Sequence, residues 1–254
     1  MIFPIGDDNT DRTTTPLVNY ALILANVLVF VLLQGMGQNE QFTYSFAAVP
    51  EEIKTGTDID RVVKIDHPLT DETISIPLGP TPISVYITLI TAMFMHGGIA
   101  HLLGNMLFLW IFGDNLEHAM GHIRYFVFYI VCGVLASLAH VATTFALDQN
   151  PYIPSLGASG AISGVLGGYV VLFPHRRVRV ILLRILTTVP AYVAIGMWFV
   201  FQIVSSLGMF GGGSQAGGVA YGAHIGGFVA GLILVKLFVA RRGLSGVRGQ
   251  PVRY

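Results

Sequence analysis

Long apolar segments alternate with polar segments along most of the 254-residue chain. The first apolar segment, Leu17 to Leu33, is close to the length that a membrane span requires. It follows three threonines and Pro16, which are typical of a helix start. The later apolar segments cover approximately 99–112, 125–147, 156–173, 190–207 and 219–239. The second is short, so part of the apolar run 83–95 is expected to belong to it. This pattern predicts an all-α integral membrane protein with six transmembrane helices.

The polar segments divide the chain into one membrane domain and two tails. We expect a tail over residues 1–16, a single six-helix domain over 17–240 and a tail over 241–254. Residues 35–82 form the longest polar segment, with eight acidic and three basic residues, and are interpreted as a structured loop on the membrane. Arginines alternate with aliphatic residues over 176–184, which predicts an interfacial connector. The glycine-rich run 211–218 is interpreted as a flexible loop and a candidate cap.

Composition supports a membrane protein and argues against a nucleic-acid partner. The chain is 53% hydrophobic and 11% charged, with a mean hydropathy of +0.67. A soluble domain carries about 25% charged residues. The formal net charge is zero, whereas nucleic-acid binding usually requires a basic excess. Membrane lipids are therefore expected partners.

The basic residues predict the orientation. With both termini in the cytoplasm, eleven basic residues lie inside and three lie outside, all three in the loop 35–82. Residues 1–16 contain three aspartates and one arginine, unlike the basic head of a signal peptide, so the first segment is expected to be a retained span. The lack of a targeting peptide favours a prokaryotic inner membrane.

Ser159 and His224 are the candidate nucleophile and base. In the predicted orientation each lies near the outer end of its helix, and a serine beside a histidine is the minimal activated nucleophile. Helical spacing places small residues on the same faces, which would let the two helices approach closely. These are Ser163 and Gly167 after Ser159, and Gly227 and Gly231 after His224. A second row, Gly160, Gly164 and Gly168, is expected to pack on another side.

His101 and Asn105 are candidates for stabilising an oxyanion. They lie four residues apart, on one face at the outer end of the second span. Both side chains can donate hydrogen bonds, together with the backbone N–H of Ser159 near a helix start. His96 and Gly157 are accessory candidates; for His96, assistance to the oxyanion site and capping of the helix start both remain open.

Together these motifs resemble the rhomboid intramembrane serine proteases. The matching patterns are His101-x-x-x-Asn105, Gly157-x-Ser159-Gly160, Ala223-His224-x-x-Gly227-x-x-x-Gly231 and the run Gly113-Asp114-Asn115-Leu116-Glu117. The resemblance implies a six-helix bundle, a Ser159–His224 catalytic dyad, an oxyanion hole with His101 and Asn105, and a water-filled cavity open to the outer side. It also implies single-span membrane proteins as substrates, cut at small residues, and no metal or cofactor. Well-known members have an aromatic residue one turn after the nucleophile, where this chain has Ser163.

Other interpretations predict different chemistry. A non-catalytic rhomboid-like protein that binds membrane proteins and guides their trafficking would lack the nucleophile or the base. A small-solute transporter would also place polar residues in glycine-rich helices, but no inverted repeat is visible. His118 and His122 have zinc-ligand spacing, yet Ala119 stands where a zinc protease requires glutamate. Trp198 and Phe199 are interpreted as aromatic packing or as the lining of a substrate gate.

Overall fold

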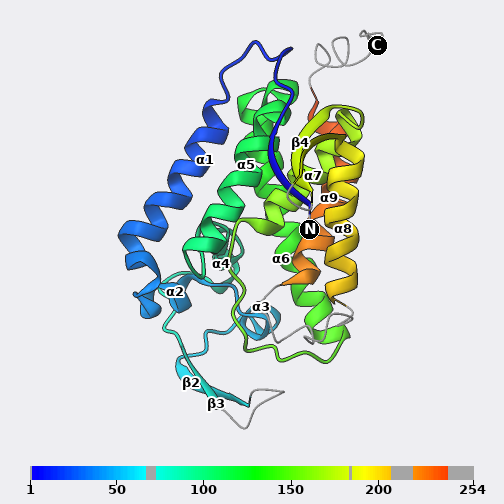
Figure 1. Ribbon diagram of the computed structural model, residues 1–254. Helices are drawn as coiled ribbons and strands as arrows, with labels where there is room; N and C mark the ends of the chain where they lie inside the picture. The colour runs from blue at the N-terminus through cyan, green and yellow to red at the C-terminus, as the bar shows by residue number, and fades with distance from the viewer. Residues whose placement is uncertain (1, 67–72, 183–184, 207–219, 240–254) are drawn as a thin grey trace.

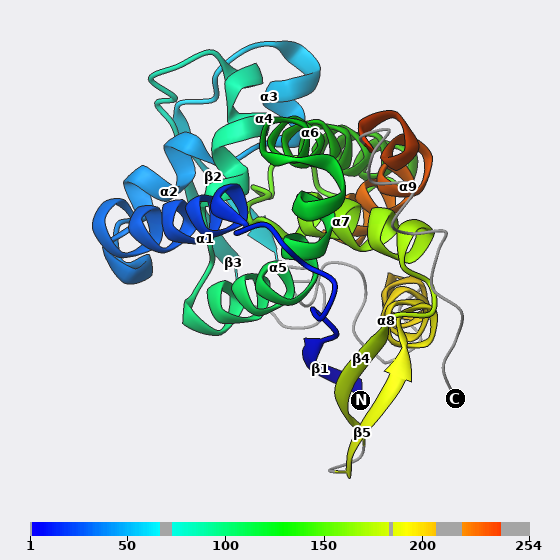
Figure 2. The same cartoon turned by 90° about the horizontal axis from the view of Figure 1, so that it is seen from above.

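In the computed structural model, which describes residues 2–66, 73–182, 185–206 and 220–239, apolar helices pack side by side around α7 (Figures 1 and 2). The bundle helices are α1 (Leu17–Leu28), α5 (Ile99–Met120), α6 (His122–Ala146), α7 (Ser159–Leu172), α8 (Ala191–Ser206) and α9 (Tyr221–Phe238). Among the described residues, α5, α6 and α9 are long and apolar enough to cross a membrane. The segments 17–33, 85–94, 159–172 and 191–204 are shorter apolar helices. The protein is therefore a mostly helical membrane protein, and six spans remains a prediction.

The described part of the polar segment 35–82 is folded, as predicted. It contains α2 (Glu40–Phe46), α3 (Pro50–Thr55), β2 (Arg61–Asp66) and β3 (Thr73–Leu78), and it lies at one end of the bundle (Figure 1). The strands pair antiparallel, and Val49, Ile76 and Leu78 form a small core beneath them. The short helix α4 (Thr88–Thr91), flanked by 3-10 turns at Val85–Ile87 and Ala92–Phe94, leads from this region into α5.

A three-stranded sheet beside the bundle departs from the all-α prediction. The strands β1 (Ile2–Asp7), β4 (Arg177–Leu182) and β5 (Ile185–Pro190) pair antiparallel in the order β1–β4–β5. Residues 177–182, predicted as a connector, thus form a central strand whose Val178 and Val180 are fully buried. Figure 2 shows the sheet extending away from the bundle next to α8. The tail over residues 1–16 is thereby partly built into the fold.

A buried polar network joins β1 to the helices. Asp7 accepts hydrogen bonds from the Tyr169 hydroxyl of α7 and from Asn115 of α5, while its second oxygen has no partner in the described part of the chain. Burial raises the pKa of the Asp7 carboxyl to about 7 from its usual value of 3.8. Arg176 contacts Asn115 and pairs with Asp11. The N-terminal residues are therefore held by charge-assisted contacts as well as by strand pairing.

Residues of α5 hold the start of α1. The buried Glu117 carboxylate accepts the backbone N–H groups of Val18 and Asn19, which satisfies donors that a helix start leaves unpaired. Asn19 in turn donates to the Leu109 carbonyl and accepts from the Tyr125 hydroxyl. The motif run 113–117 thus anchors the first helix.

Candidate functional site

Ser159 lies at the N-terminal end of α7, where the first backbone N–H groups of a helix have no intrahelical partner. The chain reaches this position through Gly157, whose φ of +125° is unfavourable for other residues. A Cβ at Gly157 would also lie 2.9 Å from Cε1 of His101. The Gly157 N–H donates to the Ala92 carbonyl, which fixes the turn. Glycine is therefore required here by both conformation and space.

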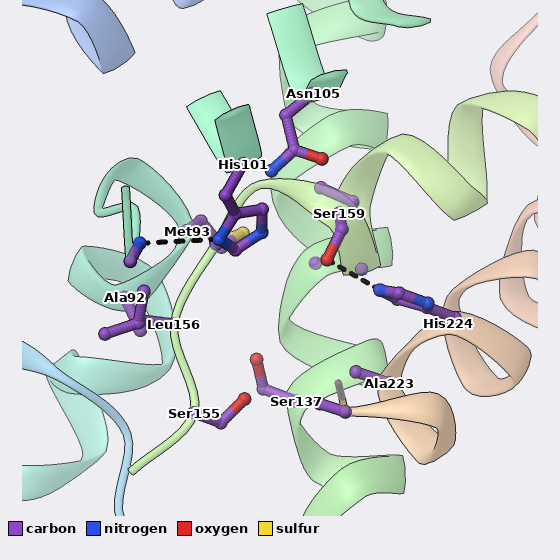
Figure 3. A pocket seen from close by; sticks show the side chains of 16 residues that line it. Ala92, Met93, His101, Asn105, Ser137, Ser155, Leu156, Ser159, Ala223 and His224 are labelled. Atoms are coloured by element: carbon purple, nitrogen blue, oxygen red, sulfur yellow. Dashed lines mark hydrogen bonds between the residues drawn. The ribbon is translucent and has the colours of Figure 1, made fainter. Parts of the chain in front are cut away.

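The structure brings the predicted nucleophile and base together. His224 lies in the first turn of α9, and its Nε2 is 2.7 Å from the Ser159 Oγ (Figure 3). Its Nδ1 is 2.8 Å from Oε1 of Gln202 on α8. Because an amide oxygen carries no hydrogen, Nδ1 must be the donor in that bond. In a neutral imidazole Nε2 is then free to accept the serine proton.

Close contact between α7 and α9 makes this geometry available. A Cβ at Gly231 would lie 2.7 Å from the carbonyl carbon of Gly164, and one at Gly227 would lie 3.0 Å from that of Gly160. The prediction that small residues allow the two helices to meet is confirmed. The row containing Gly160 and Gly164 lies closest to Ala136 and Cys132 of α6, so it packs on another helix as predicted, and it also faces α9. The physical reason is that α7 packs between α6 and α9, so one row of small residues on α7 can contact both helices.

His101 and Asn105 lie across the site from His224 (Figure 3). The Gly97 N–H donates to Nδ1 of His101 at 3.4 Å, which leaves Nε2 as the protonated nitrogen of the neutral ring. That nitrogen lies beside Gly157. The Asn105 amide nitrogen donates one hydrogen to Nε2 of His96 at 2.9 Å, and its other N–H remains for a second acceptor.

His96 holds the side chain of Asn105 in place through their hydrogen bond. Its side chain is fully buried, and Gln34 holds its backbone by one bond to the carbonyl and one from the N–H. Gly98, not His96, precedes the first residue of α5, and no capping side-chain bond is present there. Of the two roles left open for His96, the structure therefore favours orientation of Asn105 over helix capping.

A cavity of about 550 Å³ connects these groups. Its lining includes Ser159, His224, His101, Asn105 and Gly157, with Ser137 and Ser155 at its far wall (Figure 3). Backbone and hydroxyl groups thus face the reactive pair inside a largely apolar bundle. The arrangement can hold a peptide carbonyl between a nucleophilic oxygen and hydrogen-bond donors, with space for water.

Gln202 is the site residue that sequence reasoning missed. An amide within an apolar segment is itself a signal, because polar groups at membrane depth are usually functional. The Ser163 hydroxyl donates to the Ser159 carbonyl at 2.6 Å, as serines inside helices often do, and is engaged away from the imidazole. Contact with His224 instead comes from α8, where Trp198 lies 6.1 Å from it between ring centres.

The remaining candidates have other contacts. His118 bonds to Thr14, and His122 contacts Glu117. Phe199 stacks on Phe228 of α9 at 4.2 Å between ring centres, which is aromatic packing. The predicted glycine-rich cap, 211–218, and the tail 241–254 lie outside the described residues.

Comparison with known proteins defines the family. The sequence profile of the Rhomboid domain matches residues 84–241, which is more than half of the chain, and the chain belongs to the rhomboid family. It is 33% identical over 147 residues to Rhomboid protein 1, mitochondrial, of Saccharomyces cerevisiae, covering 58% of this chain and 40% of that protein.

Two further relatives show the same partial coverage. Rhomboid protease GluP of Bacillus subtilis is 32% identical over 161 residues, covering 63% of this chain and 28% of GluP. RHOMBOID-like protein 4 of Arabidopsis thaliana is 32% identical over 160 residues, covering 60% and 34%. The matches therefore span less than half the length of these relatives.

Proposed function

We propose that this protein is an intramembrane serine endopeptidase with Ser159 as nucleophile and His224 as general base. The observation that supports it best is the 2.7 Å contact between Ser159 Oγ and His224 Nε2 at a cavity that His101 and Asn105 also line. A serine and a buried histidine at this distance meet the geometric requirement for nucleophilic catalysis. Membership of a family with protease members agrees with this assignment.

The mechanism follows from the contacts. His224 accepts the Ser159 proton as Oγ attacks the substrate carbonyl carbon, and the carbonyl oxygen becomes negative. The Ser159 backbone N–H, His101 Nε2–H and the free Asn105 N–H stabilise that oxygen. The tetrahedral intermediate collapses, and His224 gives its proton to the departing amine. Water in the cavity then attacks the acyl ester, with His224 again accepting a proton, and releases Ser159.

We further infer single-span membrane proteins as substrates, cut at small residues, since the resemblance implies them. The proposed topology is a six-span domain over 17–240, with both termini in the cytoplasm of a prokaryotic cell. The distribution of charge supports this orientation. Arg12 pairs with Asp114 near the end of α5, where Glu117 also binds the start of α1, and Arg124 lies in the first turn of α6, which begins where α5 ends. Lys54 and Arg61 instead belong to α3 and β2 of the folded segment, which lies at the opposite end of the bundle (Figure 1).

The test is cleavage of a single-span substrate by purified protein in liposomes. Wild type is expected to cleave, and Ser159→Ala and His224→Ala are expected to lose at least about 10³-fold in kcat. Ser163→Ala is the matched control, because it removes a buried hydroxyl one turn away on the same helix. Cleavage by folded Ser159→Ala at the wild-type rate would exclude the mechanism. If no variant cleaves but all bind the substrate, the non-catalytic function is supported instead.

A further inference from the structure

The hydrogen bond between Gln202 of α8 and His224 fixes which nitrogen of the imidazole carries the proton. Gln202 and His224 are 7% and 9% exposed, so their bond is shielded from water. Because Oε1 can only accept, the bond is made only when Nδ1 carries the proton. That tautomer is the one in which Nε2 can accept from Ser159.

We propose that Gln202 is a positioning residue that sets the tautomer and ring orientation of His224, and that the dyad is competent only when α8 is seated against α9. This inference rests on the proposed function. Gln202 would do for His224 what the third member of a catalytic triad does, with a neutral amide in place of a carboxylate. The amide adds no charge to the apolar interior, where an unpaired charge is costly.

The position of Gln202 explains how the base is held without an aromatic residue at position 163. The Ser163 hydroxyl bonds to the helix backbone. On α8, Trp198 lies one turn before Gln202, so both side chains project from one face of that helix toward His224. One restrains the ring plane by packing, and the other restrains its rotation by a hydrogen bond.

The same geometry links the base to the seating of α8. The stacked rings of Phe199 and Phe228 hold α8 against α9. In this position the hydrogen bond between Gln202 Oε1 and His224 Nδ1 is 2.8 Å long. A displacement of α8 by about 1 Å would extend that bond beyond hydrogen-bond range. The histidine would then lose its orienting partner while remaining on α9. Movement of α8 would thereby control the chemistry through the orientation of His224.

The test compares two substitutions of similar size. Gln202→Met keeps the length of the side chain and removes the acceptor, whereas Gln202→Glu keeps an oxygen at the same place in either protonation state. We expect Met to lower kcat about 10- to 100-fold with KM changed less than about twofold, as for misplacement of a catalytic group. Glu should restore kcat to within about threefold of wild type. Val200→Met, on the exposed side of α8, is the matched control and should behave as wild type.

An independent readout separates this inference from the proposed function. In protein labelled with ¹⁵N-histidine, the His224 signals are assigned by their loss in His224→Ala. Wild type should show protonated Nδ1, and Gln202→Met should show a larger fraction protonated at Nε2. An unchanged tautomer, or equal losses of kcat in Met and Glu, overturns the positioning role. Failure of wild type to cleave would refute the protease assignment while the tautomer measurement still reports on Gln202.

Discussion

Replacement of Gly231 by alanine tests whether close packing of α7 and α9 is what assembles the dyad. The added Cβ would lie 2.7 Å from the carbonyl carbon and 2.8 Å from the Cα of Gly164. Carbon atoms pack at about 3.5–4.0 Å, so the contact with the carbonyl carbon requires the helices to separate locally by about 0.8 Å or more. The carbonyl oxygen of Gly164 lies nearer still to the added Cβ. The obstacle is backbone, which cannot rotate away as a flexible side chain can.

The separation is expected to reach the site. Gly231 lies two helical turns after His224 on the same face of α9. A shift of that size extends the Ser159–His224 contact from 2.7 Å to a distance where the hydrogen bond is weak. A misplacement of about 1 Å can cost about 10²-fold in rate, so we expect kcat to fall about 10- to 100-fold. Overpacking should also lower the free energy of unfolding by about 1–3 kcal/mol.

The assay is the kcat of cleavage in liposomes, normalised to folded protein, together with thermal unfolding in detergent. Gly196→Ala on α8 is the control, because a Cβ there meets nothing within 4 Å. It should keep wild-type kcat and gain a little stability from the helix propensity of alanine. If Gly231→Ala matched Gly196→Ala in both measurements, the reasoning that contact at Gly164 positions the base would be wrong.

Two further predictions concern other contacts. Burial raises the pKa of Asp7 to about 7, so the folded protein keeps a proton on this carboxyl that the unfolded chain loses above about pH 4. The free energy of unfolding is therefore highest below about pH 4. It falls by up to about 4 kcal/mol as the pH rises to 7. Asp7→Asn should therefore flatten the dependence of thermal stability on pH between 4 and 7 and be more stable than wild type at pH 8, and an unchanged slope would contradict the assignment. Asn105→Ala should lower kcat about 10²–10³-fold with little change in KM if its amide stabilises the oxyanion, whereas a change confined to KM would indicate substrate binding alone.

The sequence indicated the helices of the bundle and the pair at its centre because that information is local. An apolar run specifies a membrane helix, whose backbone bonds are satisfied within the segment itself. Small residues at helical spacing from Ser159 and His224 predicted that their helices could approach closely, and the structure places the two side chains in contact. The residues of the family motif at positions 101, 105, 159 and 224 could likewise be identified from the sequence.

Only the tertiary structure decided features that depend on distant partners. Strand β1 pairs with β4, more than 170 residues away, and no local pattern in residues 2–7 specifies that partner. The bond between Gln202 and His224 depends on how α8 is placed beside α9, and the bond between His96 and Asn105 depends on the turn before α5. The sequence by itself therefore determined which groups could react, since chemical identity and helical periodicity are local. Tertiary packing decided which groups orient the reactive residues. The 2.8 Å hydrogen bond between Gln202 and His224, for example, forms only if α8 and α9 are correctly placed relative to each other.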